Sequence, residues 1–289
     1  MAILYSEQTE RFYGGEAWQA HFDQHENGMY HTLIESRIPF DMLNDRLMEP
    51  KHLENYQLII LPNIAALSDT QCAQLKNYVA SGGNLVATFE TSLHDEKGTR
   101  RADFGLAELF GVSYAGEVEG PMKNSYLQIR PDPDGAFHPV LKGLEDTSRI
   151  INGIWRLKIE PKVDFPSPVT LIPSYPDLPM EHVYPRQENT GIRELYLRQY
   201  GKGRVAYIPW DIDRTCWQIM NGDHSNLLQN IIRWALAEAP PVSVEGPGVL
   251  DITTWRQQDS MTVHLVNFTN PMMLKGPYRE LLPVGSQNV

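Results

Sequence analysis

Three short, mostly apolar runs constrain the fold of this chain more than any other feature. They lie at residues 58–61 (Leu-Ile-Ile-Leu), 85–89 (Leu-Val-Ala-Thr-Phe) and 205–208 (Val-Ala-Tyr-Ile). A strand with one face in water alternates apolar and polar residues, so these runs predict strands buried on both faces. Helical segments, and no hairpin turns, separate the first two runs. The pattern predicts a doubly wound α/β fold, with a parallel sheet of about five strands between two layers of helices.

The segments around these runs fit the same pattern. Ser68 is a good N-cap for a helix that runs to about Ala80, where Ser81, Gly82 and Gly83 end it. An apolar stripe at helical spacing predicts a second helix over residues 225–238. Toward the N-terminus we expect a strand at residues 2–5, a polar loop at 6–15, a helix at about 16–36 with a break near Asn27 and Gly28, and a strand at 38–43.

Two regions depart from this pattern. Between residues 114 and 200, proline- and glycine-rich pieces interrupt short alternating strands, which indicates an irregular β-rich insertion. Residues 1–239 would then form one α/β domain that contains this insertion. The pair Pro240 and Pro241 marks a boundary, and residues 240–289 hold a few strand-like segments that are too few to close a sandwich. We expect this last part to be the start of a small β-sandwich domain that the chain truncates.

The overall charge limits the classes of partner. The formal net charge is −11 and the basic residues are scattered, which argues against nucleic acid or an anionic membrane as the main partner. Cys72 and Cys216 do not have the spacing of a metal site, and no histidine motif suggests one, so we expect no metal and no cofactor. No signal-like or membrane-spanning apolar run is present, so we expect a soluble chain, cytoplasmic rather than secreted.

Several segments resemble a known family. They are residues 3–6 (Ile-Leu-Tyr-Ser), 56–62 (Tyr-Gln-Leu-Ile-Ile-Leu-Pro), 67–68 with 75–79, and most specifically 81–96 (Ser-Gly-Gly-Asn-Leu-Val-Ala-Thr-Phe-Glu-Thr-Ser-Leu-His-Asp-Glu). The sequences of these segments are similar to those of the trimerisation domain of family 42 β-galactosidases and related hypothetical glycosyl hydrolases. The similarity covers residues 1 to about 113 and about 200–240, and residues 264–270 resemble the small β domain that follows.

The resemblance implies a flavodoxin-like fold of the class I glutamine amidotransferase type, and self-association as a homotrimer. In that family the catalytic carboxylates lie on an upstream (β/α)8 barrel, which this chain lacks. The resemblance therefore implies a non-catalytic accessory or oligomerisation domain of a carbohydrate-active protein, whose parent would be a glycosidase. The alternative is a free-standing small-molecule or sugar-binding domain or enzyme that uses the crevice at the carboxyl ends of the parallel strands.

Four polar residues are expected to line that crevice, because each follows a predicted strand: Ser6, Asn63, Glu90 and Asp211. An amidotransferase would carry a nucleophilic cysteine near Glu90, whereas this chain has Phe-Glu-Thr-Ser at residues 89–92. Neither cysteine is placed to replace it, so the sequence argues against glutaminase chemistry and indicates no catalytic residue.

Two polar clusters are candidate binding sites. The loop at residues 90–96 gathers Glu90, Ser92, His94 and Asp95, which could bind a ligand or ion, or could be a solvated acidic loop that contacts a neighbouring subunit. The second cluster combines an aromatic ring with carboxylates, as sugar sites often do. Alternatively, its tryptophan packs in the core and its first carboxylate makes local contacts. Its members are Trp210, Asp211, Asp213 and His224.

Aromatic residues in loop-like sequence are the candidates for an oligomer interface. Phe12 and Tyr13 lie in the glycine-containing segment 11–15, and Tyr175 and Tyr184 lie in the insertion. Such side chains are hard to bury within one subunit, so we expect them to contact a second copy.

Overall fold

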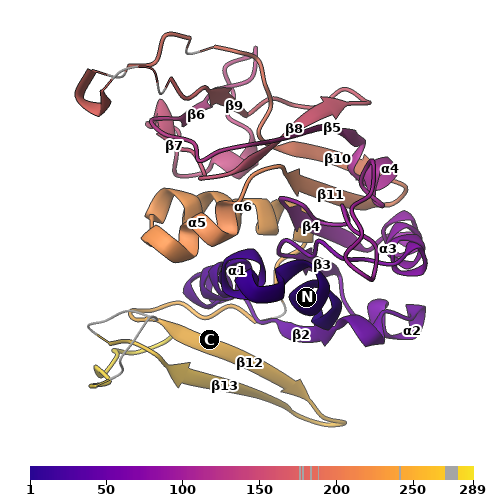
Figure 1. Cartoon of the computed structure of the whole chain (residues 1–289). Coiled ribbons are helices and arrows are strands. Elements are labelled where there is room, and N and C mark those ends of the chain that lie inside the picture. The colour runs from indigo at the N-terminus through magenta and orange to yellow at the C-terminus, as the bar shows by residue number, and fades with distance from the viewer. Residues whose placement is uncertain (176, 178, 183, 188, 241, 271–278) are drawn as a thin grey trace.

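The computed structural model describes every residue except 176, 178, 183, 188, 241 and 271–278. Its central element is a six-stranded sheet in the order β10-β11-β4-β3-β1-β2, in which β10 alone runs antiparallel to its neighbour (Figure 1). The predicted doubly wound parallel sheet is confirmed, and the three apolar runs form β3, β4 and β11, three of its four interior strands. The strands are β1 (Ala2–Tyr5), β2 (Asp41–Asn44), β3 (Leu58–Leu61), β4 (Asn84–Thr88), β10 (Tyr196–Tyr200) and β11 (Gly203–Ile208).

Helices cover both faces of this sheet (Figure 1). One face packs against α1 (Gln24–Ser36), α5 (Ile212–Ile219) and α6 (Gly222–Leu236), and the other against α2 (Pro50–Leu53), α3 (Asp69–Ser81) and α4 (Ala107–Phe110). Successive strand residues alternate between the two cores: Ile59 belongs to one and Ile60 to the other, and both are 0% exposed. This two-sided burial explains why the strands are apolar at nearly every position.

The predicted start of α3 is confirmed by a capping box. The Ser68 hydroxyl accepts a hydrogen bond from the Gln71 backbone at 3.1 Å, and the Gln71 side chain accepts one from the Ser68 backbone at 2.9 Å. The helix ends at Gly82, whose φ of 123° is readily adopted only by glycine.

The N-terminal segment differs from the expectation in two ways. Residues 9–15, predicted as part of a polar loop, instead form the π-helical turn η1 (Thr9–Gly14) and the first residue of the 3-10 turn η2 (Gly15–Ala17). The π-helical turn η3 (Gln19–Asp23) lies within the helix predicted at about 16–36 and leads into α1. The predicted break near Gly28 is also wrong, because α1 is continuous there. A Cβ at Gly28 would lie 1.9 Å from the Asp213 carbonyl oxygen, so this glycine permits close packing of α1 on α5.

The middle of the chain forms two small antiparallel sheets with the orders β5-β8 and β7-β6-β9. They lie above the main sheet in Figure 1. The following strand, β10, pairs with β11 and so belongs to the main sheet. The elements of this region are β5 (Val112–Glu119), β6 (Tyr126–Ile129), η5 (Pro139–Leu141), β7 (Arg149–Ile151), β8 (Arg156–Pro161), β9 (Val169–Ile172) and η6 (Met180–His182); the turn η4 (Asp45–Leu47) follows β2.

The C-terminal part contains a hairpin of β12 (Leu250–Arg256) and β13 (Met261–Asn267). A small core of its own includes Leu250 and Ile252. Arg37, at the end of α1, donates hydrogen bonds to the carbonyls of residues 246–248 and so ties this part to the α/β domain. Within the described part of the chain, no helix combines the length and the apolar character needed to span a membrane.

Candidate functional site

A connected set of buried polar contacts lies at the carboxyl ends of β3 and β4. Asn63 and Phe89, just beyond these strands, both adopt a φ of 46°, which turns the chain sharply. The Asn63 amide oxygen accepts a hydrogen bond from the Glu90 backbone at 3.1 Å, and the Asn63 backbone donates to the Thr88 hydroxyl at 2.8 Å. Phe89 occupies the left-handed position at the end of β4, where the resemblance places the elbow cysteine of an amidotransferase. Its apolar ring cannot act as a nucleophile.

A histidine that the sequence analysis did not single out joins this set. The Nδ1 atom of His25 lies 2.7 Å from a carboxylate oxygen of Asp213, and both side chains are almost fully buried. The second Asp213 oxygen accepts a hydrogen bond from the Thr88 hydroxyl at 2.6 Å. The Asp213 carboxylate therefore links α1, β4 and α5 in the interior.

Glu90 is paired within the chain. The Tyr13 hydroxyl donates a hydrogen bond to one Glu90 oxygen, and Arg100 lies 3.3 Å from the other. The Tyr13 ring packs between two imidazoles, with ring-centre distances of 5.3 Å to His21 and 5.0 Å to His94. Burial raises the pKa of the Tyr13 hydroxyl and lowers the pKa of both histidines. At neutral pH the tyrosine therefore keeps its proton as a donor, and the imidazoles are mainly uncharged.

The Trp210 cluster is also buried. The Trp210 side chain is 1% exposed and its Nε1 donates to the Glu194 carbonyl oxygen at 3.0 Å, so the core-packing alternative describes its position. One Asp211 oxygen accepts backbone hydrogen bonds from residues 154 and 155 at 2.9 and 3.0 Å, and the other accepts one from Arg214. His224 Nε2 lies 2.7 Å from the Ile151 carbonyl oxygen. In this arrangement the indole offers no face on which a sugar could stack.

Three of the remaining candidates make hydrogen bonds with other groups of the same chain. The Ser6 hydroxyl donates to Asp45 at 2.9 Å, and the Ser92 hydroxyl accepts from the Leu106 backbone at 3.1 Å. Asp95 accepts from the backbones of residues 97 and 99 at 2.9 and 2.8 Å, and hydrogen bonds, that of Thr99 foremost, lower its pKa. The structure thus brings together Asn63, Glu90, His94 and Asp213, whereas Ser6 bonds to Asp45, Ser92 to the Leu106 backbone, and Asp95 to the backbone of its own turn.

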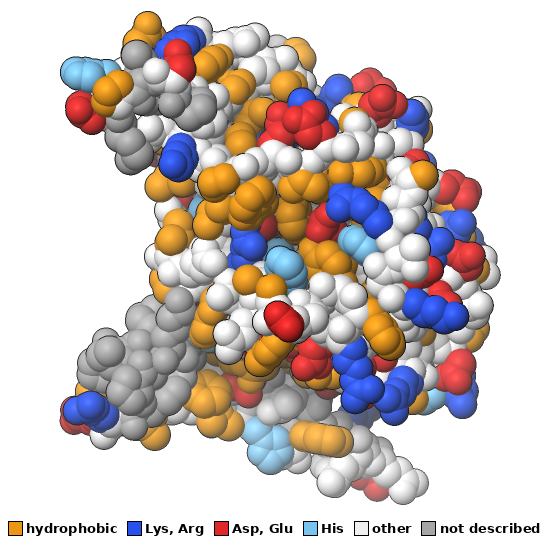
Figure 2. All heavy atoms as spheres, in the orientation of Figure 1, with side chains coloured by type: hydrophobic (Ala, Val, Ile, Leu, Met, Phe, Trp, Pro, Cys, Tyr) orange, Lys and Arg blue, Asp and Glu red, His pale blue; other side chains and the backbone are white. Residues whose placement is uncertain are grey.

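A few nitrogen atoms near this set have no partner among the described residues. They are Nε2 of His25, Nδ1 of His21 and His94, and Nε of Arg214. Figure 2 shows histidine and charged side chains among hydrophobic ones on the central part of the face in view. These nitrogens could contact a small polar ligand. Burial raises the pKa of the Cys72 and Cys216 thiols to about 11, so neither is a thiolate at neutral pH. Within the described part of the chain, no cluster of three or more His, Cys, Asp or Glu residues is arranged to hold a metal ion.

The four candidate interface aromatics have different environments. Phe12 is 57% exposed and Tyr184 is 60% exposed. Tyr175 is half-buried, and the Arg186 guanidinium lies 5.1 Å from its ring centre. Tyr13 is not a free surface aromatic, because its contacts with Glu90 and the two histidines are made within the subunit. Residues 176, 178 and 183 of the predicted interface segment lie outside the described residues.

Comparison with family models gives a match to a family described as the beta-galactosidase trimerisation domain. Residues 1–124 match this domain. The resemblance inferred from residues 3–6, 56–62 and 81–96 is therefore confirmed over this part of the chain. Comparison with curated proteins found no match.

Solved structures share the fold over most of the chain. A GH42 beta-galactosidase from G. stearothermophilus is 21% identical with a TM-score of 0.64, and the match covers 93% of this chain and 34% of that one. A beta-galactosidase from Bacillus circulans sp. alkalophilus is 14% identical with a TM-score of 0.64, covering 92% and 35%. Alpha-L-fucosidase isoenzyme 2 from Paenibacillus thiaminolyticus is 18% identical with a TM-score of 0.66, covering 98% and 39%. This chain thus spans about a third of the length of the beta-galactosidases.

Proposed function

We propose that this chain is a non-catalytic assembly domain of a larger glycoside hydrolase-like protein, and that it associates as a homotrimer. The match of residues 1–124 to the beta-galactosidase trimerisation domain carries the proposal. The shared fold with two beta-galactosidases, over 92–93% of this chain, supports it. On this reading an upstream (β/α)8 barrel in the parent protein supplies the glycosidase chemistry.

The geometry at the carboxyl ends of the strands supports a structural role for the polar residues there. Asp211 and Asp213 are 0% exposed, and each accepts several hydrogen bonds from its own subunit. Glu90 is held by Tyr13 and Arg100. Carboxylates that act on a substrate must be accessible to it. Asp213 instead joins α1, β4 and α5. Asp211 joins residues 154 and 155 to the start of α5, and Glu90 joins the segment after β4 to η1.

The alternative, a small-molecule site at the same place, is favoured by one observation. The imidazole nitrogens of His21, His25 and His94 that lack partners could bind a polar ligand. Activity assays separate the two functions. We expect the chain to hydrolyse neither aryl glycosides nor glutamine above background. Turnover that persists after purification and disappears in Glu90→Gln would contradict the non-catalytic proposal.

Sedimentation velocity of the unmodified chain tests the assembly proposal directly. At a concentration of about tens of micromolar, which is ample for a specific oligomer, we expect a species of three times the 32.9 kDa chain mass. A strictly monomeric chain under these conditions would contradict self-association through this domain.

A further inference from the structure

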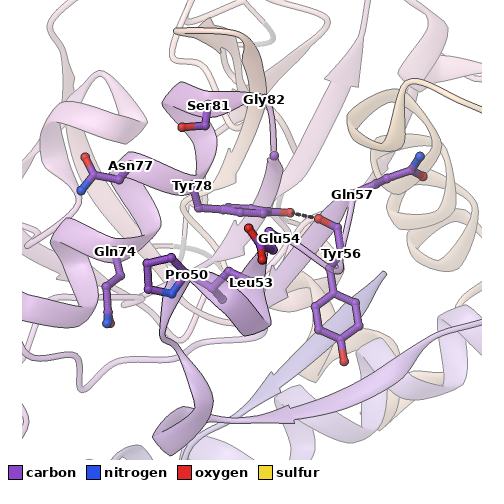
Figure 3. Close-up of a pocket in the computed structure, with 11 residues that line it drawn as sticks. Pro50, Leu53, Glu54, Tyr56, Gln57, Gln74, Asn77, Tyr78, Ser81 and Gly82 are labelled. Carbon is purple, nitrogen blue, oxygen red and sulfur yellow. Dashed lines mark hydrogen bonds between the residues drawn. The ribbon is translucent and has the colours of Figure 1, made fainter.

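A pocket lies where β3 and β4 begin, at the end of the sheet opposite to the buried polar contacts described above. It is formed between α2 and the C-terminal end of α3 and has a volume of about 430 Å³ (Figure 3). This volume falls within the range of small-molecule sites in proteins. None of the polar residues at the carboxyl ends of the strands lines it.

An aromatic ring held in place by the backbone forms part of the pocket wall. The Tyr78 hydroxyl donates a hydrogen bond to the Tyr56 carbonyl oxygen at 2.8 Å, as drawn in Figure 3. Gly83 lies against the same ring, since a Cβ at this position would be 2.1 Å from the ring atom Cζ. Pro50, at the start of α2, adds exposed apolar surface, and Leu53 supports this wall from the core, where its side chain is 1% exposed. The ring is therefore fixed before any ligand arrives, which lowers the entropic cost of binding.

The polar groups around this ring are almost all uncharged. Glu54 is the single charged residue of the lining, and neither lysine nor arginine contributes to it. Gln57 donates to Glu238 at 3.2 Å. The side chains of Glu54, Gln74, Asn77 and Ser81 have no hydrogen-bond partner in the part of the chain that the structure describes, so their donors and acceptors are available. Without a cationic residue, the pocket is poorly suited to phosphate or carboxylate ligands.

We propose that this pocket binds a neutral pyranose. A pyranose ring has an apolar face of C–H groups that packs on an aromatic ring, and an equatorial set of hydroxyls that pair with amides and carboxylates. The Tyr78 ring and Pro50 supply the first kind of contact. Gln74, Asn77 and Glu54 supply the second. The inference rests on the pocket alone and is independent of the oligomeric state of the chain.

Protein-observed NMR titration with methyl β-D-galactopyranoside and methyl β-D-glucopyranoside tests the proposal. Titration to about 50 mM is needed, because a single sugar with few contacts binds weakly. We expect saturable shifts, at the amides of residues 50–57 and 74–83, with at least one of the two glycosides. Inorganic phosphate, added in the same way, is expected to leave these amides unchanged.

A double variant and a matched control locate the site. Gln74→Ala with Asn77→Ala removes two amides from the surface of α3, where alanine favours the helix, and should weaken sugar binding about tenfold or more. Gln229→Ala removes an amide from α6, outside the pocket, and should leave binding unchanged. Absence of saturable shifts with both glycosides would overturn the proposal. If the double variant bound the glycoside as tightly as the unmodified chain does, the proposal would also be overturned.

Discussion

Glu26, on α1, is a carboxyl group in an unfavourable environment. Burial, together with the nearby charges of Asp23 and Glu10, raises its pKa from 4.5 to about 7. The folded protein thus holds this proton more tightly than the unfolded chain. The contribution of Glu26 to stability must therefore fall as the pH rises from about 4.5 to 7 and stay lower above that range. We expect Glu26→Gln to raise the free energy of unfolding by about 1–2 kcal/mol at pH 8, after allowance for solvent screening, and to change it little at pH 4.5.

Urea denaturation at both pH values measures this difference. Glu16→Gln, at an exposed position of η2, is the control and should be neutral at either pH. An equal effect of Glu26→Gln at pH 4.5 and pH 8 would show that burial of the charge is not the cause.

Asp213 accepts hydrogen bonds from three groups at once: the imidazole of His25, the hydroxyl of Thr88 and the backbone of Arg214. Asp213→Ala would leave these donors buried without an acceptor, so we expect the free energy of unfolding to fall by about 2–4 kcal/mol. Thermal or urea unfolding checks this, with the exposed Asp259→Ala as a control. A loss no larger than that of the control would mean that Asp213 does not hold the strand ends together.

The packing of α1 on α5 depends on the absence of a side chain at Gly28. A Cβ there would be 1.9 Å from the Asp213 carbonyl oxygen, which belongs to the backbone and cannot rotate away. We expect Gly28→Ala to push the helices apart and to lower the free energy of unfolding by about 2–3 kcal/mol. Gly222→Ala, in α6, has no atom within 4 Å of the new Cβ and should be neutral or stabilising by up to about 1 kcal/mol. Similar losses in both variants, measured by urea unfolding, would contradict this account.

Elements could be predicted from the sequence where a few consecutive residues carry the whole pattern of a strand or a helix cap. The strands β3, β4 and β11 were identified because burial on both faces makes nearly every position apolar, and α3 because Ser68 and Gln71 form its cap within four residues. The helical turn from Thr9 to Gly14 was missed, since a π turn shifts the apolar spacing away from the 3.6-residue period. Gly28 was interpreted as a helix breaker because the sequence does not show which backbone will lie beside it.

The polar residues at the strand ends were only partly predictable. Asn63, Glu90 and Asp211 were identified because each directly follows a strand. His25 was missed, because its partner Asp213 is 188 residues away and no local pattern records that contact. Tyr13 was predicted to face another subunit, whereas its hydroxyl bonds to Glu90, 77 residues away. The pocket between α2 and α3 corresponds to no sequence motif, since the residues that line it come from the ends of several elements.

At the scale of the whole molecule, the two ends of the sheet differ in chemistry. At the carboxyl ends, buried carboxylates accept hydrogen bonds from other side chains of the subunit. At the amino ends, mostly uncharged polar side chains surround a fixed aromatic ring, and those of Gln74, Asn77 and Ser81 have no hydrogen-bond partner among the described residues. Exposed apolar side chains occur elsewhere, including Phe12 on η1 and Trp18, which is 40% exposed, beside η2. A surface for self-association therefore need not overlap the proposed sugar pocket.

Substitution of Phe12 tests the assembly proposal with little disturbance of contacts inside the subunit. Its side chain is 57% exposed, whereas the neighbouring Tyr13 is held within the subunit. Aromatic residues at the centre of an interface commonly contribute a large share of the binding energy, so Phe12→Ser should weaken the trimer about tenfold or more.

Ile219→Ser, at a 49% exposed position at the end of α5, is the matched control and should sediment like the unmodified chain. Both variants should unfold at unchanged temperature, because neither side chain is buried in the core. A Phe12→Ser variant that remains fully trimeric at low micromolar concentration would place the interface elsewhere, and we would then test Tyr184→Ser in the insertion by the same measurement.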